Sequence, residues 1–443
     1  RGANSPWLAA CWFGVVKAGG IAVGTMPLLR ARELSTIAHK AQVTHALCDA
    51  KLAHELELAR PACPALQQVL HYGDAADTGL AARAKSKPSD FAAVDTALDD
   101  VCLIAFTSGT TGQPKGTMHF HRDVMAACAC WPPHVLRASA DDRFIGSPPL
   151  AFTFGLGGLL LFPLAIGAST VLLEKATPDV LLAAIAQWRA SVCFTAPTSY
   201  RAMAAQVAAH DLSSLRKCVS AGEALPAATR ALWQQATGIE MIDGIGSTEL
   251  LHIFISATEA QARGGATGLV VPGYRACVLD EQGRELPRGQ VGRLAVKGPT
   301  GCRYLADERQ TSYVQGGWNL TGDAYRIGDD GQFEYQARTD DMIVSGGYNI
   351  AGPEVEAALL MHPAVAECAV IGAEDEQRGQ IVKAFVVLHA GHAADEALAK
   401  TLQDFVKQTI APYKYPRAIE FRSDLPRTET GKLQRFRLRQ SVA

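Results

Sequence analysis

The strongest indication of the fold is an apolar stretch that ends in a loop of small residues, between Ile104 and Thr117. Residues 101 to 106 have the continuous apolar pattern of a buried strand, and seven of the ten residues from 107 to 116 are Thr, Ser or Gly. Glycines in such a loop let backbone N–H groups converge on one point, which suits an anion. The stretch therefore predicts a strand followed by a phosphate-binding loop.

The side chains of this loop also suit phosphate, because its hydroxyls can donate hydrogen bonds and Lys115 supplies a mobile positive charge. It is not a Walker A loop, since that motif places the lysine directly before Ser or Thr at a helix start. Here Pro114 precedes the lysine and Gly116 follows it. The predicted phosphate ligands are Thr107, Ser108, Gly109, Thr110, Thr111 and Gly112, together with Lys115.

Composition excludes several classes of partner. The net charge is −2 and no basic block is present, so we expect no nucleic-acid partner. The apolar runs are too short and too broken to span a bilayer, so we expect no membrane partner. The 11 cysteines form no C-x-x-C pair, which favours free thiols and a cytoplasmic location.

Strand and helix patterns alternate along residues 169–208, which predicts an α/β class. A helix over residues 5–18 and a buried strand over 21–25 are expected at the start of the chain. In a second motif, D-G-I-G-S-T-E-L-L-H at residues 243–252, Thr248 and Glu249 follow a strand. Gly222 and Glu223 follow a further strand, and ligands of open α/β sheets gather at such strand ends.

The run T-S-G-T-T-G-Q-P-K-G at residues 107–116 resembles the signature loop of the adenylate-forming superfamily, which includes acyl- and aryl-CoA ligases, peptide-synthetase adenylation domains and luciferases. The resemblance covers most of the chain. It implies a large N-terminal domain of stacked α/β sheets with a small barrel-like β subdomain, residues 1–339, and a small mobile α+β domain, residues 340–443. Asp340 falls on the hinge. Relative to the family, the chain is expected to be truncated at its N-terminus.

The resemblance also implies residue roles in ATP binding. Thr248 would contact phosphate, Glu249 would hold Mg²⁺, and Lys432 in the terminal L-P-R-T-E-T-G-K run would be catalytic. Asp323 would accept the ribose hydroxyls and Arg338 would reach ribose or phosphate. The residues implied around adenine are Gly222, Glu223, Ala224, Asp243, Gly244 and Ile245. Ile245 replaces the usual tyrosine, so adenine would pack against an aliphatic side chain.

Residues 246–254 nearly reproduce a run of the benzoate- and 2-aminobenzoate-CoA ligase branch, which implies an aromatic acid as substrate. The aromatics and glycines of residues 148–158 are also what a pocket wall requires. The predicted pocket residues are Thr153, Phe154, Gly246, His252 and Ile253. Of the nearby pair His119 and His121, we expect His121 to pack behind the phosphate loop.

The predicted function is an AMP-forming aryl-CoA ligase that uses ATP, Mg²⁺ and CoA. Rotation about Asp340 would withdraw Lys432 and present Gly346, Gly347 and Tyr348 as the CoA tunnel. Alternatives are an adenylation enzyme that loads a carrier-protein pantetheine, and a CoA ligase for other aryl or medium-chain acids. A binding-only sensor is a third, although Lys115, Glu249, Asp323 and Lys432 are all intact. Assembly is left open, with a homodimer as one option.

Overall fold

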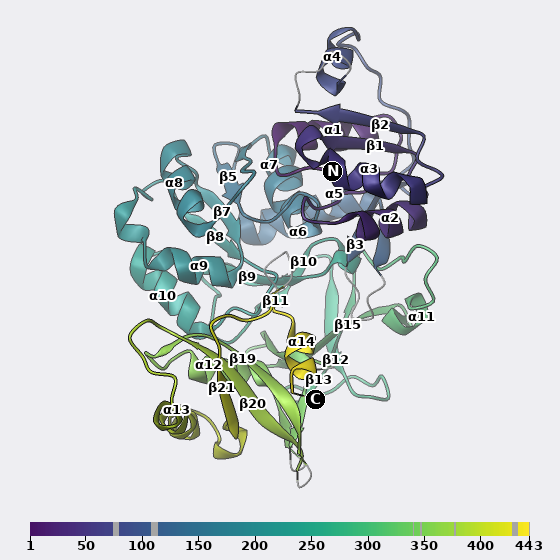
Figure 1. Cartoon of the computed structure of the whole chain (residues 1–443). Helices are drawn as coiled ribbons and strands as arrows, with labels where there is room; N and C mark the ends of the chain where they lie inside the picture. The colour runs from purple at the N-terminus through teal and green to yellow at the C-terminus, as the bar shows by residue number, and fades with distance from the viewer. Residues whose placement is uncertain are drawn as a thin grey trace.

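The computed structural model describes residues 1–73, 79–107, 114–339, 341–345, 348–375, 378–427 and 433–442. In Figure 1 the C-terminal strands and helices gather at the bottom, below the N-terminal elements and below strands β5 to β9. The N-terminal elements are α1 (Pro6–Lys17), α2 (Ala31–Lys40), β1 (His45–Asp49), α3 (Ala53–Ala59), β2 (Gln68–Tyr72), α4 (Leu80–Lys85), β3 (Val101–Thr107), β4 (Lys115–Phe120) and α5 (His121–Cys130).

A mixed sheet with the strand order β11-β10-β9-β8-β7-β5-β6 forms the centre of the molecule. Its strands β5 to β9 run parallel, whereas β10 and β11 are antiparallel to their neighbours. The strands are β5 (Arg143–Gly146), β6 (Ser169–Val171), β7 (Val192–Thr195), β8 (Lys217–Ser220), β9 (Met241–Gly246), β10 (Ile253–Ser256) and β11 (Leu269–Val270). β7 and β8 are buried throughout, as expected of parallel strands covered on both faces.

Helices cover this sheet and contribute to its core. The helical segments are α6 (Thr153–Leu156), η4 (Gly157–Leu161), α7 (Phe162–Ala165), α8 (Pro178–Trp188), α9 (Pro197–Ala204) and α10 (Ala227–Thr237). The largest apolar cluster includes the fully buried rings of Trp131, Phe144, Phe162 and Phe194. A second cluster, around Trp233, lies between the sheet and helices α8 to α10. These two cores fix the carboxyl ends of the parallel strands relative to one another.

An antiparallel sheet follows in the chain, in the order β12-β13-β15-β14 with β16 beside β15. Its elements are β12 (Arg275–Leu279), β13 (Val291–Lys297), α11 (Gln310–Tyr313), β14 (Val314–Gln315), β15 (Trp318–Ile327) and β16 (Phe333–Arg338). The C-terminal elements are β17 (Ile343–Ser345), β18 (Tyr348–Ile350), α12 (Gly352–Leu359), β19 (Val365–Asp375), β20 (Gly379–Leu388), α13 (Glu396–Thr409), β21 (Ala418–Phe421) and α14 (Arg435–Gln440). These C-terminal elements have their own apolar clusters, as a small α+β domain requires.

The strand expected over residues 21–25 does not form. Ala22 alone pairs with Leu103 of β3, through hydrogen bonds to the backbone on either side of that residue. Gly24 already lies against the backbone of Ala151, where a Cβ atom would come within 3.1 Å of the Ala151 Cα. The chain therefore leaves β3 after a single bridge. None of the helices in the described ranges combines the length and apolar character that a bilayer span requires.

Gly155 and Gly14 give a matched test of this packing. A Cβ atom on Gly155 would lie 2.1 Å from the Pro149 carbonyl oxygen, so Gly155→Ala must displace backbone and should lower the free energy of unfolding by about 3 kcal/mol. Gly14 is an exposed residue of α1 with no neighbouring atom near such a Cβ, so Gly14→Ala should raise it by about 0.5–1 kcal/mol. Urea unfolding measures both. Equal effects of the two substitutions would contradict the tight packing at Gly155.

Candidate functional site

Lys115 and Glu249, predicted from separate motifs, lie on either side of the Tyr304 hydroxyl. Lys115 Nζ lies 3.3 Å from Tyr304 Oη, and this hydroxyl donates to Glu249 Oε1 at 2.6 Å. Burial, and then the charge of Glu249, raise the pKa of Tyr304 well above its usual range, so the phenol stays neutral. Nothing in the sequence around Tyr304 marks it as a site residue. A cation, a phenol and a carboxylate from distant segments thus form one polar cluster.

Thr107 lies next to this cluster, because it pairs with Lys115 across the β3–β4 hairpin. Thr248 and Glu249 belong to the short helical turn η6 (Thr248–Leu250), in which Ser247 Oγ accepts from the Leu250 N–H at 3.2 Å. The predicted loop ligands that lie outside the described residues are Ser108, Gly109, Thr110, Thr111 and Gly112.

His119, and not His121, packs behind the site. His119 is fully buried on β4, and its Nε2 lies 2.8 Å from the Thr248 carbonyl oxygen. A carbonyl oxygen only accepts, so Nε2 carries the proton and donates. His121 starts helix α5 instead. The expectation for His121 is therefore wrong. On β4 the inward-facing position belongs to residue 119, where it supports the Thr248–Glu249 turn.

The predicted adenine residues meet at the carboxyl ends of the neighbouring strands β8 and β9, where Ser220 pairs with Asp243. Asp243 is buried, and burial raises its pKa to about 7 against the opposing charge of Arg230. Gly222 has a φ of 94°, which favours glycine, and no atom lies within 4 Å of the place of a Cβ atom. The remaining predicted adenine residues at these two strand ends are Glu223, Ala224, Gly244 and Ile245. The edge thus presents open backbone and one buried carboxyl group.

The predicted ribose residues form a pair across β15 and β16. Arg338 Nη1 donates to Asp323 Oδ1 at 3.0 Å and to the Thr321 carbonyl oxygen at 3.1 Å. A Cβ atom on Gly322 would lie 2.6 Å from Arg338 Nη2, so glycine leaves room for the guanidinium group. Burial first, and then the charges of Glu249 and Asp323, raise the pKa of Tyr313. Both carboxylates therefore lie near the half-buried Tyr313, whose hydroxyl oxygen is buried.

His252 lies in a cage of aromatic rings. Its ring centroid is 4.5 Å from that of Phe162, 5.7 Å from that of Trp131 and 5.8 Å from that of Phe154. Burial lowers the His252 pKa to about 3, so the imidazole is neutral. Within the described residues, neither ring nitrogen makes a hydrogen bond of normal geometry. The predicted pocket residues Phe154 and His252 are thus brought together, whereas Trp131 and Phe162 were missed.

The turn between Glu249 and His252 is strained. Leu251 has φ 69° and ψ −46°, and the His252 N–H donates to the Leu250 carbonyl oxygen at 2.9 Å, which is a γ-turn. A Cβ atom on Gly246 would lie 2.7 Å from the His252 backbone, so only glycine permits the β9–β10 approach. Ile253 begins β10, and Thr153 is buried at the start of α6. Strain of this kind persists where surrounding packing enforces it, often at functional sites.

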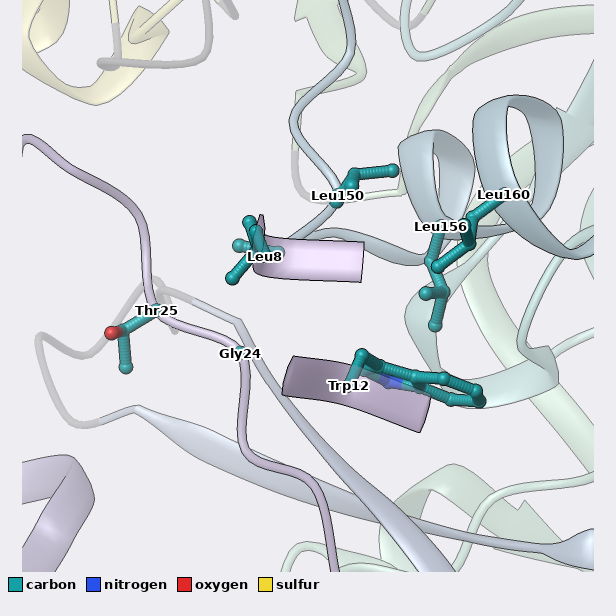
Figure 2. Close-up of a pocket in the computed structure, with 8 residues that line it drawn as sticks. Leu8, Trp12, Gly24, Thr25, Leu150, Leu156 and Leu160 are labelled. Carbon is teal, nitrogen blue, oxygen red and sulfur yellow. The ribbon is translucent and has the colours of Figure 1, made fainter. Parts of the chain in front are cut away.

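A separate apolar cavity lies beside the helical segment that runs through α6 and η4 (Figure 2). Its lining residues are Leu8, Trp12, Gly24, Thr25, Leu150, Ala151, Leu156 and Leu160. No charged side chain lines it, so it does not suit phosphate. Gly157, between Leu156 and Leu160, contacts the His252 ring, so this stretch borders both the cavity and the aromatic cage.

Several predicted residues cannot be placed. Asp340, Gly346, Gly347 and Lys432 lie outside the described residues, and of Tyr348 only its backbone in β18 is described. Their roles, and the domain boundary at residue 340, stay predictions.

Glu249 is the candidate Mg²⁺ ligand. The described residues contain no cluster of three or more His, Cys, Asp or Glu side chains that could hold a metal ion. Mg²⁺ bound to a nucleotide needs only one or two carboxylates, because phosphates and water complete its shell. One Glu249 oxygen accepts from Tyr304, and the carboxylate retains further acceptor capacity. The residues present therefore fit a nucleotide-bound Mg²⁺.

The chain belongs to the family of AMP-binding enzymes. The family model described as AMP-binding enzyme matches residues 2–304, and the model of the AMP-binding enzyme C-terminal domain matches residues 354–432. The predicted superfamily, α/β class and AMP-forming ligase class are thereby confirmed. So is the presence of a small C-terminal domain, because solved CoA ligases share the fold.

Curated relatives agree with this class. The chain is 40% identical over 382 residues to a benzoate–CoA ligase of Thauera aromatica, and this match covers 85% of this chain and 72% of that protein. It is 33% identical to a 4-hydroxybenzoate–CoA/benzoate–CoA ligase of Rhodopseudomonas palustris, over 97% of this chain and 81% of the relative. The solved anthranilate CoA ligase AuaEII, in complex with anthranoyl-AMP, has a TM-score of 0.94 and 37% identity. That match covers 100% of this chain and 86% of AuaEII.

Asp243 should make stability depend on pH. Its pKa is about 7 in the folded chain and 3.8 when unperturbed, so between these values the folded state holds a proton that the unfolded state has released. Stability must therefore fall as pH rises through this window. Asp243→Asn should remove this decrease in stability with rising pH. It should raise the free energy of unfolding at pH 7.5 by up to about 4 kcal/mol, with little change at pH 4. Urea unfolding at both values measures this, and the same pH dependence in both proteins would contradict it.

Proposed function

We propose that the chain is an aryl–CoA ligase, which uses ATP to activate an aromatic carboxylic acid as acyl-AMP and then transfers the acyl group to CoA. The observation that carries the proposal is the turn from Glu249 to His252. Within four residues it joins the polar cluster of Lys115 and Glu249 to the aromatic cage around His252. A candidate phosphate-binding group and a cluster of aromatic rings, held side by side, suit the activation of an arylate.

In the first step the substrate carboxylate attacks the α-phosphorus of ATP, and the bond to the bridging oxygen breaks to release pyrophosphate. Lys115 and the Thr248 hydroxyl would hold phosphate oxygens, and Asp323 would accept the ribose hydroxyls. The buried carboxyl of Asp243 would face adenine. Mg²⁺ held by Glu249 would supply positive charge for the phosphate oxygens.

The aromatic cage would orient the acid and exclude water from the acyl-AMP. In the second step the CoA thiolate attacks the acyl carbonyl carbon, and AMP leaves. Lys432 would bridge the carboxylate and the α-phosphate in the first step only. Rotation about Asp340 would then exchange it for the Gly346–Gly347 loop, so that one site serves both steps.

Neutral His252 supports an aromatic acid over a charged or strongly polar one. The imidazole is uncharged at any physiological pH because burial lowers its pKa to about 3. Its ring faces three aromatic rings, so the surroundings favour a flat apolar group. The names of the relatives point the same way, since benzoate, 4-hydroxybenzoate and anthranilate are all arylates.

The direct test is AMP release with MgATP, with and without CoA. Benzoate, 2-aminobenzoate and 4-hydroxybenzoate should each be compared with octanoate and a branched acid. We expect CoA-dependent AMP release with at least one arylate at a kcat/KM above that for either aliphatic acid. Faster turnover of octanoate than of every arylate would contradict the aromatic preference. Arylate-dependent pyrophosphate formation that CoA does not accelerate would instead favour a carrier-protein acceptor.

Truncation of His252 tests the pocket. His252→Ala should lower kcat/KM for the preferred arylate by roughly 10- to 100-fold, because the aromatic ring of the acid then loses the side chain against which it would pack. The loss for the branched acid should be smaller, and the Kd for ATP should stay unchanged. His392→Ala, at an exposed loop position, is the control and should have no effect. Equal losses for all acids, accompanied by weaker ATP binding, would mean that His252 only supports the fold.

A further inference from the structure

Tyr304 holds an unusual place between two charged groups of opposite sign. It lies outside any helix or strand, but its segment pairs with β4, because Met118 N–H donates to the Arg303 carbonyl and Leu305 N–H to the Gly116 carbonyl, both at 2.8 Å. The Tyr304 N–H donates to Gln310 Oε1 at 2.7 Å. These backbone contacts fix the segment without help from the hydroxyl group.

The direction of the hydrogen bonds follows from the groups present. A phenol has one proton, and the Glu249 carboxylate accepts only, so Tyr304 donates to Glu249 Oε1 at 2.6 Å. The phenol oxygen then offers its lone pairs to Lys115, whose Nζ lies 3.3 Å away. The same ammonium group lies 5.2 Å from the centre of the Tyr304 ring.

Lys115 and Glu249 are both described, and they make no direct ion pair with each other; the hydroxyl group lies between them. In a half-buried site an ammonium and a carboxylate attract each other strongly, because water screens them poorly. A direct pair would occupy the ammonium that phosphate oxygens need and the oxygen that a cation needs. The hydroxyl group of Tyr304 hydrogen-bonds to Glu249 on one side and to Lys115 on the other, and so prevents a direct ion pair between them.

We propose that Tyr304 is a positioning residue that keeps the Lys115 ammonium and the Glu249 carboxylate apart, so that each stays available for a nucleotide and its cation. This inference rests on the proposed function, because it assigns the Lys115 side of the cluster to phosphate. It predicts that, without the hydroxyl group, Glu249 forms a direct ion pair with Lys115. The Lys115 ammonium is then no longer available to phosphate oxygens.

The test is ATP binding by isothermal titration calorimetry in EDTA, which needs neither acid, CoA nor metal. Tyr304→Phe keeps the ring and removes only the hydroxyl, and it should raise the Kd for ATP by about tenfold. Adding Glu249→Gln to this variant removes the competing charge and should return the Kd to within about twofold of the single Glu249→Gln protein. A merely structural loss would not be rescued by this second substitution.

Tyr72→Phe is the matched control. Tyr72 is also buried, and its hydroxyl donates to the carbonyl oxygen of Arg1 at 2.9 Å and not to a residue of the candidate site. Its loss should leave ATP binding unchanged. Wild-type Kd in Tyr304→Phe, or a loss that Glu249→Gln does not rescue, would overturn the proposal. Absence of ATP binding to the wild-type chain would overturn it together with the proposed function. Normal binding without turnover of any arylate would overturn the proposed function alone.

Discussion

The close approach of β9 and β10 is the constraint on which the site depends. Gly246 lets the two strands meet, since a Cβ atom there would lie 2.7 Å from the His252 backbone. The chain must then reverse within a few residues, and it does so through the strained turn at Leu251. As a result Glu249 faces the polar cluster while His252 enters the aromatic cage. Two chemically opposite environments are thereby held a few residues apart.

The surroundings of this turn are built to support each environment. On the polar side, His119 donates a hydrogen bond to the Thr248 carbonyl oxygen, and Tyr304 donates one to the Glu249 carboxylate. On the apolar side, Gly157 leaves room for the His252 ring, since a Cβ atom there would lie 2.4 Å from it. Hydrogen bonds to charged groups fix direction, whereas ring packing fixes shape. On the proposed function, this arrangement would separate phosphate binding from recognition of the acid.

Local motifs predicted the parts of this site that lie in continuous runs. Lys115 and Glu249 each belong to a short motif that follows a strand, so both could be named as candidates without knowledge of the distance between them. Tyr304 could not be predicted, because it reaches the cluster only through pairing of its segment with β4. The expectation for His121 was wrong because strand alternation puts residues 119 and 121 on the same face and cannot distinguish them. The strand β4 ends at Phe120 and His121 begins α5, so the buried imidazole is that of His119.

The most direct measurement of the central claim is exchange of labelled pyrophosphate into ATP in the absence of CoA. If the Glu249–His252 turn joins a nucleotide site to an arylate pocket, exchange should require benzoate or a substituted benzoate. It should also be lost in both Lys115→Ala and Glu249→Gln. Exchange that proceeds equally well without any acid, or that persists in both variants, would contradict the assignment of these residues and of the pocket beside them.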